Sequence, residues 1–268
     1  MSSQNIIKND VLTLGIDIGS TTSKCVAVKN GGQIVGKALI QNGIGTTGPQ
    51  RALQQLFDSS GISLPDFAYV IATGYGRFTC DTANSEMSEL SCHAKGARLL
   101  FADVSTVIDI GGQDAKVMRI DSGGVLENFA MNDKCAAGTG RFLDVMARIL
   151  ELSVEDLGET GNQSTSVVEI SSTCTVFAET EVISQLARGT NRIDVVAGIN
   201  KSVASRVSGL VKRVGAVPLV VLTGGVAQNI GVRSALETQL GVPIHISPLS
   251  QYTGAIGAAL FAYEIACR

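Results

Sequence analysis

The chain has 268 residues, of which 45% are hydrophobic and 17% are charged, and its formal net charge is −3. This balance argues against binding to nucleic acid or to an anionic membrane surface, because both require a basic patch. No apolar run reaches the length of about 18 residues that a membrane span needs, and the first ten residues lack the layout of a secretory signal. We therefore expect a soluble cytoplasmic protein whose six cysteines are reduced thiols.

Apolar periodicity predicts strands that alternate with helices along the whole chain. In the first half, strands are expected at 11–18, 23–29, 34–40 and 67–72 and helices at 49–57 and 86–101. In the second half, strands are expected at 104–110, 115–120, 125–131, 167–171, 218–222 and 243–247, and helices after Cys135, after Cys174, at 194–214, after 223–229 and at 252–266. Such alternation is typical of α/β architecture.

A strand that ends in Asp-Ile-Gly occurs twice, once at Asp17 and once at Asp109. In each copy a second strand, a glycine turn, a third strand and a helix follow. This internal duplication predicts two similar lobes. Because no low-complexity linker separates the two copies, we expect the lobes to touch and to enclose a cleft.

The segment from Gly15 to Lys24 combines glycine with four consecutive hydroxyl residues after a buried strand. Backbone amides, hydroxyl groups and a lysine are suitable donors to phosphate oxygens, although the GxxxxGK[ST] pattern of a Walker A loop is absent. Asp17 and Asp109 could meet across the cleft and hold Mg²⁺ with a nucleotide. A plain turn would explain one Asp-Ile-Gly, but not two copies together with a glycine-rich strand end at 223–229.

Cys135 and Cys174 each precede an expected helix. The positive end of a helix dipole favours a thiolate, so both residues are candidate ligands of a metal or cluster. Both could instead be small buried hydrophobes, the usual fate of an intracellular cysteine, and spacing alone favours that interpretation because no CxxC pair is present. The remaining cysteines lack this setting and are expected to be structural: Cys25, Cys80, Cys92 and Cys267.

Three motifs, DIGSTTSK (17–24), DIGGQDAK (109–116) and LTGGVAQN (222–229), resemble the phosphate-1, phosphate-2 and adenosine motifs of the acetate/sugar kinase, heat-shock chaperone and actin superfamily. With NDKCAAGTGRFLD (132–144), SSTCTVFAETEVISQ (171–185), ATGYGR (72–77) and MSELSCHAKGA (87–97), the chain is similar to the ATP-dependent activators of 2-hydroxyacyl-CoA dehydratases and to their kin, the ATPase subunits of benzoyl-CoA reductase. The resemblance extends from about Leu14 to the C-terminus.

This resemblance implies an α/β, duplicated actin-like ATPase fold with two ribonuclease-H-like lobes around a nucleotide cleft. The first lobe is expected at 1–102, completed by the C-terminal helix 251–268, and the second lobe, which carries Cys135 and Cys174, at 103–250. In that family the two motif cysteines ligate a 4Fe–4S cluster. Because such a cluster takes four thiolates, one cluster per symmetric homodimer is expected.

The implied function is ATP-driven transfer of one electron. Ferredoxin or flavodoxin would reduce the cluster, and ATP hydrolysis to ADP would drive the electron to the partner, an iron–sulfur heterodimeric dehydratase. On this resemblance the phosphates would be bound by Ser20, Thr21, Thr22, Ser23, Lys24, Gly111, Gly112 and Gln113. The adenosine side would be bound by Thr223, Gly224, Gly225, Val226, Ala227 and Gln228, and the Mg²⁺ by Asp17 and Asp109. Gln113 or Asp114 would orient the attacking water.

Two other functions remain open on the same superfamily motifs. A small-molecule kinase would transfer phosphate to a sugar or carboxylate, would have no use for Cys135 and Cys174, and would be colourless. A non-catalytic assembly protein like actin would form filaments and contain no iron.

Overall fold

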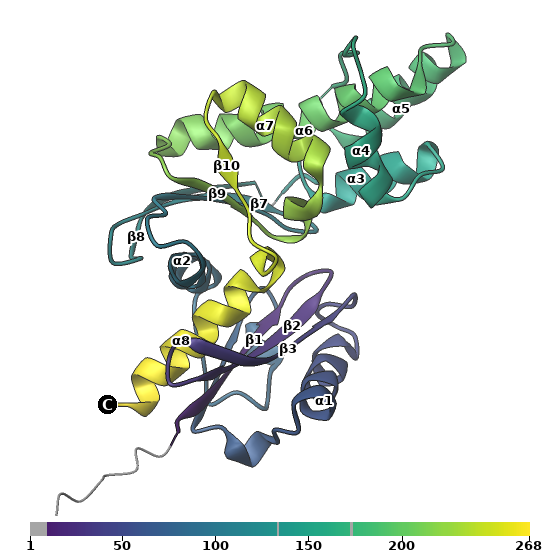
Figure 1. The fold of residues 1–268 in the computed structure, drawn as a ribbon. Coiled ribbons are helices and arrows are strands. Elements are labelled where there is room, and N and C mark those ends of the chain that lie inside the picture. Colours follow the sequence, from purple (N-terminus) through teal and green to yellow (C-terminus); the bar gives the residue numbers. More distant parts are fainter. Residues whose placement is uncertain (1–9, 133, 172–173) are drawn as a thin grey trace, which may run out of the picture. The chain divides into compact units, whose positions relative to one another are not determined.

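The computed structural model describes residues 10–132, 134–171 and 174–268 (Figure 1). The described chain divides into two units. One comprises the described part of Met1–Gly96 together with Gly254–Arg268, and the other is Ala97–Thr253. Each unit contains one five-stranded sheet.

The sheet of the first unit has the order β3-β2-β1-β4-β5. Its strands are β1 (Leu12–Ile18), β2 (Ser23–Lys29), β3 (Gln33–Ile40), β4 (Tyr69–Thr73) and β5 (Ser85–Glu86). The first three strands form an antiparallel meander, and β4 lies parallel to β1 on its other side. The helices of this unit are α1 (Gly48–Ser60) and most of α2 (Glu89–Leu100) and α8 (Thr253–Ala266), with short 3-10 turns at Leu64–Asp66 and Arg77–Thr79.

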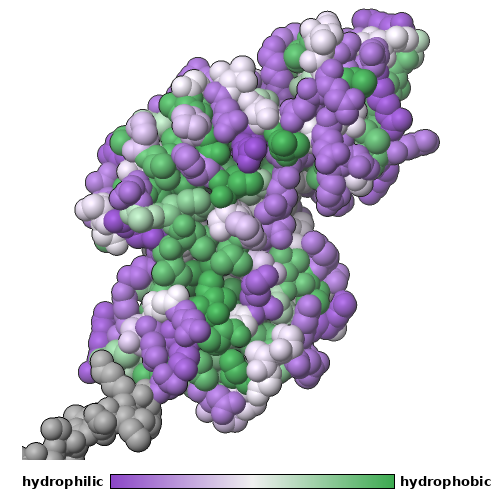
Figure 2. Space-filling view, viewed as in Figure 1, coloured by the Kyte–Doolittle hydropathy of each residue, from purple (hydrophilic) through white to green (hydrophobic). Residues whose placement is uncertain are grey.

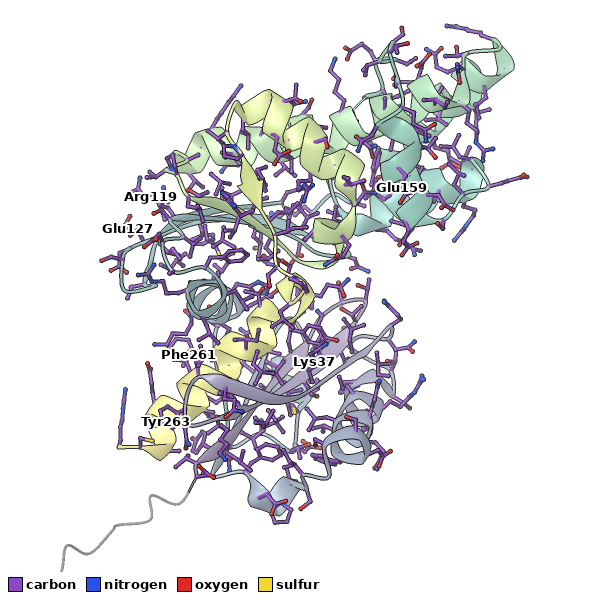
Figure 3. All side chains as sticks on the ribbon, in the orientation of Figure 1. Lys37, Arg119, Glu127, Glu159, Phe261 and Tyr263 are labelled. Carbon is purple, nitrogen blue, oxygen red and sulfur yellow. The ribbon has the colours of Figure 1, made fainter. Side chains whose placement is uncertain are left out.

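Side chains of β1 alternate between two covered faces of this sheet, as the period of two in a strand requires. Leu14 and Ile16 belong to the core that α1 covers. On the opposite face Thr13 Oγ1 donates to the carbonyl of Ala259 in α8 at 2.9 Å. Helix α8 is apolar, and Figure 2 shows hydrophobic residues along it. The Lys95 ammonium lies over the ring of Phe261 in α8, and its Nζ is 5.2 Å from the ring centroid. Phe261 is labelled in Figure 3.

Gly15 permits the close approach of α8 to β1. A Cβ at this position would lie 1.9 Å from the carbonyl oxygen of Ala255. We expect Gly15→Ala to lower the free energy of unfolding by about 3 kcal/mol, because the helix would have to move away from the sheet. Gly209→Ala is the control, since this exposed helical glycine has open space around it and alanine should stabilise the helix by about 0.5–1 kcal/mol. Urea unfolding measures both, and equal midpoints would contradict the close approach.

The second unit repeats the strand arrangement of the first, with the order β10-β9-β6-β7-β8. Its strands are β6 (Thr106–Ile110), β7 (Ala115–Ile120), β8 (Leu126–Asn132), β9 (Val220–Thr223) and β10 (Ile244–His245). Its helices are α3 (Gly140–Ile149), α4 (Val154–Gly161), α5 (Thr175–Ala187), α6 (Arg192–Val214) and α7 (Ile230–Leu240), with 3-10 turns at Gly225–Gln228 and Ser250–Tyr252. Strands β6, β7 and β8 form the same antiparallel meander, and β9 is parallel to β6. The predicted duplication is confirmed.

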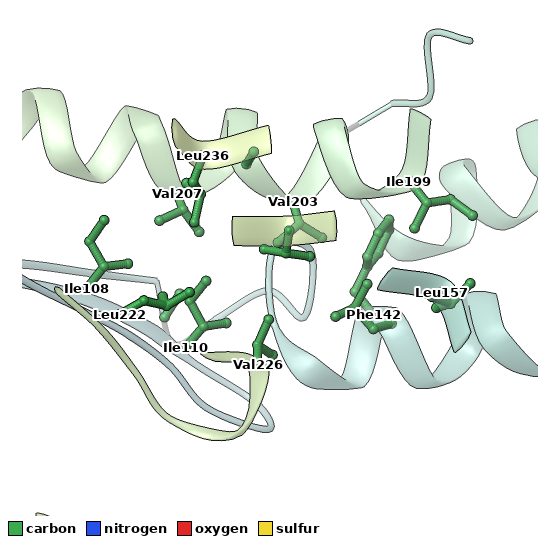
Figure 4. Close-up of a cluster of buried hydrophobic side chains, with 14 of the residues drawn as sticks. Ile108, Ile110, Phe142, Leu157, Ile199, Val203, Val207, Leu222, Val226 and Leu236 are labelled. Atoms are coloured by element: carbon green, nitrogen blue, oxygen red, sulfur yellow. The ribbon is translucent and has the colours of Figure 1, made fainter. Parts of the chain in front are cut away.

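The core of the second unit lies between the sheet and helices α6 and α7, which lie over one face of the sheet in Figure 1. Ile108 and Leu222 from the sheet meet Val203 and Val207 of α6 (Figure 4), and this core continues to Phe142 of α3. Because strand side chains alternate, Asp109, Lys116 and Thr223 lie on the opposite face of the sheet.

One predicted strand is wrong, and one helix escaped prediction. Residues 167–171 are not a strand, because their backbone meets helix α6 instead of a strand edge: Gly198 leaves room for the Val168 carbonyl, and Ser202 Oγ donates to Ser171 O at 3.1 Å. The helix that escaped prediction is α4, which begins at a capping box formed by Ser153 and Asp156.

Among the described helices, none combines the length and apolarity needed to cross a bilayer.

Candidate functional site: paired Asp–Lys loops and a cysteine segment

Asp17 and Lys24 form a cross-strand ion pair at the end of the first hairpin. They are register partners between β1 and β2, and Lys24 Nζ lies 3.0 Å from Asp17 Oδ2. The Asp17 side chain is 4% exposed and that of Lys24 is 15% exposed. Gly74 must be glycine beside this pair, because it has a φ of +84° and its Cβ would lie 2.4 Å from Asp17 Oδ1.

The second hairpin carries the same pair in a more buried form. Asp109 and Lys116 are register partners between β6 and β7, with Nζ 3.5 Å from Asp109 Oδ2 and 2.8 Å from Asp114 Oδ2. Thr223 Oγ1, at the end of β9, donates to Asp109 Oδ1 at 2.8 Å. Lys116 and Asp109 are each 3% exposed. One buried lysine therefore pairs with two carboxylates, the buried Asp109 and the partly exposed Asp114.

The hydroxyl residues after β1 divide into two groups. Ser20, Thr21 and Thr22 lie at the turn between β1 and β2, where the Gly19 amide donates to the Thr22 carbonyl at 2.9 Å. Ser23 is buried, and its hydroxyl donates to Asn42 O at 2.8 Å. The side chains of the turn residues are only half-buried, whereas the Ser23 side chain holds the following loop.

The turn between β6 and β7 consists of Gly111, Gly112, Gln113 and Asp114. The Gly111 amide donates to Asp114 O at 2.9 Å, and a Cβ at Gly111 would lie 2.6 Å from Asp114 Oδ1. Gln113 is exposed, and Asp114 is half-buried beside Lys116. Of these two candidates for orienting water, Gln113 has the side chain that is not held in an ion pair with Lys116.

The predicted adenosine segment follows β9. Gly224 has a φ of +84° and lies against the backbone of Ile110, which excludes any larger residue. The Val226 side chain packs into the core, and Ala227 is buried. Gly225 and Gln228 are exposed. The exposed residues of the segment are accessible from solvent, whereas the side chains of Thr223, Val226 and Ala227 are buried.

The two candidate cysteines occupy different positions relative to their helices. Cys174 is the N-cap residue of α5, as the sequence indicates. Cys135 was expected at the start of a helix, but α3 begins at Gly140 with Thr139 as its N-cap. Helices α3 and α5 pack against each other and share the core through Phe142 and Val182. The two cysteine segments therefore precede paired helices of one unit.

Cys135 lies in a short loop whose backbone carbonyls accept hydrogen bonds from Asn132 before it and Thr139 after it. Asn132 Nδ2, at the end of β8, donates to Cys135 O at 2.9 Å and to Ala137 O at 3.0 Å. Thr139 Oγ1 donates to Ala136 O at 2.6 Å. A defined loop, and not a helix dipole alone, positions Cys135.

None of the six cysteines, all of which lie in the described part of the chain, forms a disulfide. Burial raises the pKa of the Cys92 thiol to about 12 and raises the pKa of Cys25 further. Both thiols therefore stay protonated at neutral pH and behave as small apolar groups. Cys135 and Cys174 are only half-buried. Exposure thus separates the two candidate ligands from these buried thiols.

The family model of the BadF/BadG/BcrA/BcrD ATPase family matches residues 14–262. The chain belongs to this ATPase family. It is 59% identical to the (R)-2-hydroxyglutaryl-CoA dehydratase activating ATPase of Acidaminococcus fermentans, over 96% of this chain and 99% of that protein. It is 53% identical to the activator of lactoyl-CoA dehydratase of Anaerotignum propionicum, over 95% and 98% of the two chains.

Solved structures of similar fold are consistent with this family membership. The activator of the 2-hydroxyisocaproyl-CoA dehydratase from Clostridium difficile, solved with bound ADPNP, is 52% identical and has a TM-score of 0.93, with 96% of each chain covered. A ROK family glucokinase from Streptomyces griseus, at 14% identity and a TM-score of 0.57, covering 94% of this chain and 99% of its own, shares the fold alone. The predicted actin-like ATPase fold is confirmed.

Sequence reasoning missed the roles of Lys116, Asn132 and Gly140 in this ATPase. A signal for Lys116 was present, because the spacing between aspartate and lysine is the same in DIGSTTSK and DIGGQDAK. Asn132 and Gly140 stand within a motif that was singled out for its cysteine. Asn132 donates to Cys135 O and Ala137 O within the same motif, whereas the Gly140 amide donates to Gly111 O in a turn far away in the sequence.

Proposed function

We propose that this ATPase activates a 2-hydroxyacyl-CoA dehydratase by delivering one electron to it at the expense of ATP. The observation that carries the proposal is that the half-buried residues Cys135 and Cys174 precede helices α3 and α5, which pack against each other in the unit that also holds the Gly111–Gln113 turn. Relatives at 52–59% identity that are named as dehydratase activators support it. The reaction would take place in the cytoplasm, with ferredoxin or flavodoxin as the electron donor.

The phosphates of ATP would bind at the two hairpin turns. Ser20, Thr21, Thr22 and Lys24 would donate from the first turn, and the amides of Gly111, Gly112 and Gln113 from the second. Ser23 would serve the first turn through its bond to Asn42 O. Gly224, Gly225 and Gln228 would line the adenosine side, and Thr223, Val226 and Ala227 would shape that segment. Gln113 would orient the attacking water, and Asp114 would hold the turn through Lys116.

Asp17 and Asp109 have chemistry that suits Mg²⁺, which prefers carboxylate oxygens together with phosphate oxygens and water. A lysine ammonium lies beside each carboxylate, 3.0 Å from Asp17 and 3.5 Å from Asp109. Asp17 fits a direct ligand better, because Thr223 and Lys116 already engage both oxygens of Asp109.

Cys135 and Cys174 would be the ligands of a 4Fe–4S cluster. One chain offers two such thiols, and a cluster takes four, so a homodimer would hold one cluster on its two-fold axis. Val176, Phe177 and Ile183 of α5 are 66%, 63% and 51% exposed beside Cys174, as suits a helix that partners cover. Such a cluster supplies one-electron reduction. Each chain would supply two of the four cysteine sulfurs and hold them where the dehydratase can approach.

The proposal is tested by activation of a dehydratase without oxygen. Reduced protein, Mg²⁺ and an inactive 2-hydroxyacyl-CoA dehydratase are mixed with ATP, and separate assays use 2-hydroxyglutaryl-, lactoyl- and 2-hydroxyisocaproyl-CoA. We expect activity with at least one pair when ATP is present and none when ADPNP replaces it. ADP release that depends on a small-molecule acceptor, with no dehydratase activation, would instead support a kinase.

Asp17→Asn is expected to weaken Mg²⁺-dependent nucleotide binding at least about tenfold, or about 1.4 kcal/mol, because it removes a buried charge that would face the metal. The matched control is Asp10→Asn, which breaks the exposed pair of Asp10 with Lys29 and should leave binding unchanged. Calorimetry with ADPNP, with Mg²⁺ and with EDTA, measures both variants. Equal affinities for the two variants would remove Asp17 from the metal site.

A further inference from the structure

The N-terminus of α3 is capped by the turn that we assign to the phosphates. The Gly140 amide donates to Gly111 O at 2.9 Å, and the Arg141 amide donates to Gly112 O at 2.8 Å. The first amides of a helix have no partner within the helix, and the N-cap Thr139 makes no side-chain cap bond here. The carbonyls of the β6–β7 turn therefore take the place of a capping side chain.

The same peptide groups face in two directions. A peptide group is planar, with its C=O and N–H pointing to opposite sides. The carbonyls of Gly111 and Gly112 accept from α3, so the amides of Gly112 and Gln113 in the same peptide groups point away from α3. These are amides that we assign to the phosphate. A phosphate bound there would polarise and orient the same two groups on which α3 rests.

A second connection joins the other end of the Cys135 loop to this turn. Asn132 is the register partner of Ala115, the residue directly after Asp114. Its side-chain amide donates to the carbonyls of Cys135 and Ala137. The Cys135 loop is therefore attached at its beginning through Asn132 and at its end through Gly140, both times to the hairpin that carries Gly111–Asp114.

We propose that Asn132 and Gly140 are positioning residues that set the position of Cys135 according to the phosphates bound at Gly112 and Gln113. The route lies wholly within the second unit. This inference rests on the proposed phosphate and cluster roles of these residues and names the regulation of that site. Gly140 is suited to this role because a Cβ there would lie 3.2 Å from Gly111 O and 3.4 Å from Gly112 Cα, so that the turn would have to move by a few tenths of an ångström.

Hydrogen exchange followed by mass spectrometry tests the coupling on the full chain, purified without oxygen, with Mg·ADP or Mg·ADPNP. Compared with Mg·ADP, we expect Mg·ADPNP to slow hydrogen exchange at 110–118 and also to change hydrogen exchange at 134–141. If neither segment responds, the phosphate role fails and the proposed function fails with it. If only 110–118 responds, the nucleotide binds as proposed but the coupling to Cys135 is wrong.

Gly140→Ala should keep the response at 110–118 and reduce the response at 134–141 several-fold. Gly209→Ala, which adds the same methyl group in open space on α6, should respond like the wild type. Asn132→Ala should weaken the response at 134–139 without the added bulk, so the test remains decisive if Gly140→Ala does not fold. A wild-type response of 134–141 in both Gly140→Ala and Asn132→Ala would overturn the inference.

Discussion

Cys135→Ser and Cys174→Ser are each expected to reduce iron and acid-labile sulfide to background. A hydroxyl is a poor ligand for cluster iron, and losing one ligand per chain removes two of the four thiolates of a shared cluster. ATP-dependent activation of the dehydratase should be lost with the iron. Elemental analysis and visible absorption of protein purified without oxygen give the readout.

Nucleotide binding and one further cysteine provide the controls for these variants. ADPNP affinity should stay at the wild-type level in both, because the phosphate turns do not include either cysteine. Cys267→Ser removes an exposed thiol near the C-terminus and should keep full iron. Normal iron content in Cys135→Ser would return Cys135 to a packing role and would support an ATPase without a cluster.

Lys116→Met is expected to cost about 3–5 kcal/mol of unfolding free energy, because it leaves the buried Asp109 carboxylate without its cation. Lys116 also neutralises Asp114 at 2.8 Å, so the turn that carries Gln113 should lose its fixed conformation and ATP hydrolysis should fall. Urea unfolding and ATP turnover measure the two effects.

Neutralising the Asp109 carboxylate distinguishes the loss of charge compensation from the loss of side-chain packing as the cause of the destabilisation. The double variant Lys116→Met/Asp109→Asn should recover a large part of the lost stability, because the uncompensated charge is then gone. Lys24→Met is the comparison in the first unit, where the lysine is more exposed and has one carboxylate partner at 3.0 Å, and its cost should be smaller. If the double variant were no more stable than Lys116→Met, the charge argument would be wrong.

The parts of the fold that follow short-range patterns could be predicted from the sequence. The two Asp-Ile-Gly hairpins have period-two strands and glycine turns, and the sequence predicts the succession of strand, turn and strand along the chain in both. The start of α5 was also predictable, since apolar periodicity begins directly after Cys174. Residues 167–171 show how alternation misleads, because a strand also needs a neighbouring strand edge, and this segment meets helix α6.

The fine geometry of the site depends on contacts that hydrophobic periodicity and turn patterns do not predict. Thr223 reaches Asp109 only because β9 pairs in parallel with β6. Cys135 stands four residues before the N-cap of α3 because Gly138 turns the chain at a φ of +85° and Asn132 holds the loop. Neither contact has a signature in the local sequence, so the cysteine was found and its setting was not.

The most direct test of this account is the iron and acid-labile sulfide content of the wild-type protein, purified without oxygen and sized in the same preparation. The account predicts a dimer with about four irons and about four sulfides per two chains. An iron-free, colourless protein that still hydrolyses ATP would contradict the central claim and would identify Cys135 and Cys174 as packing residues.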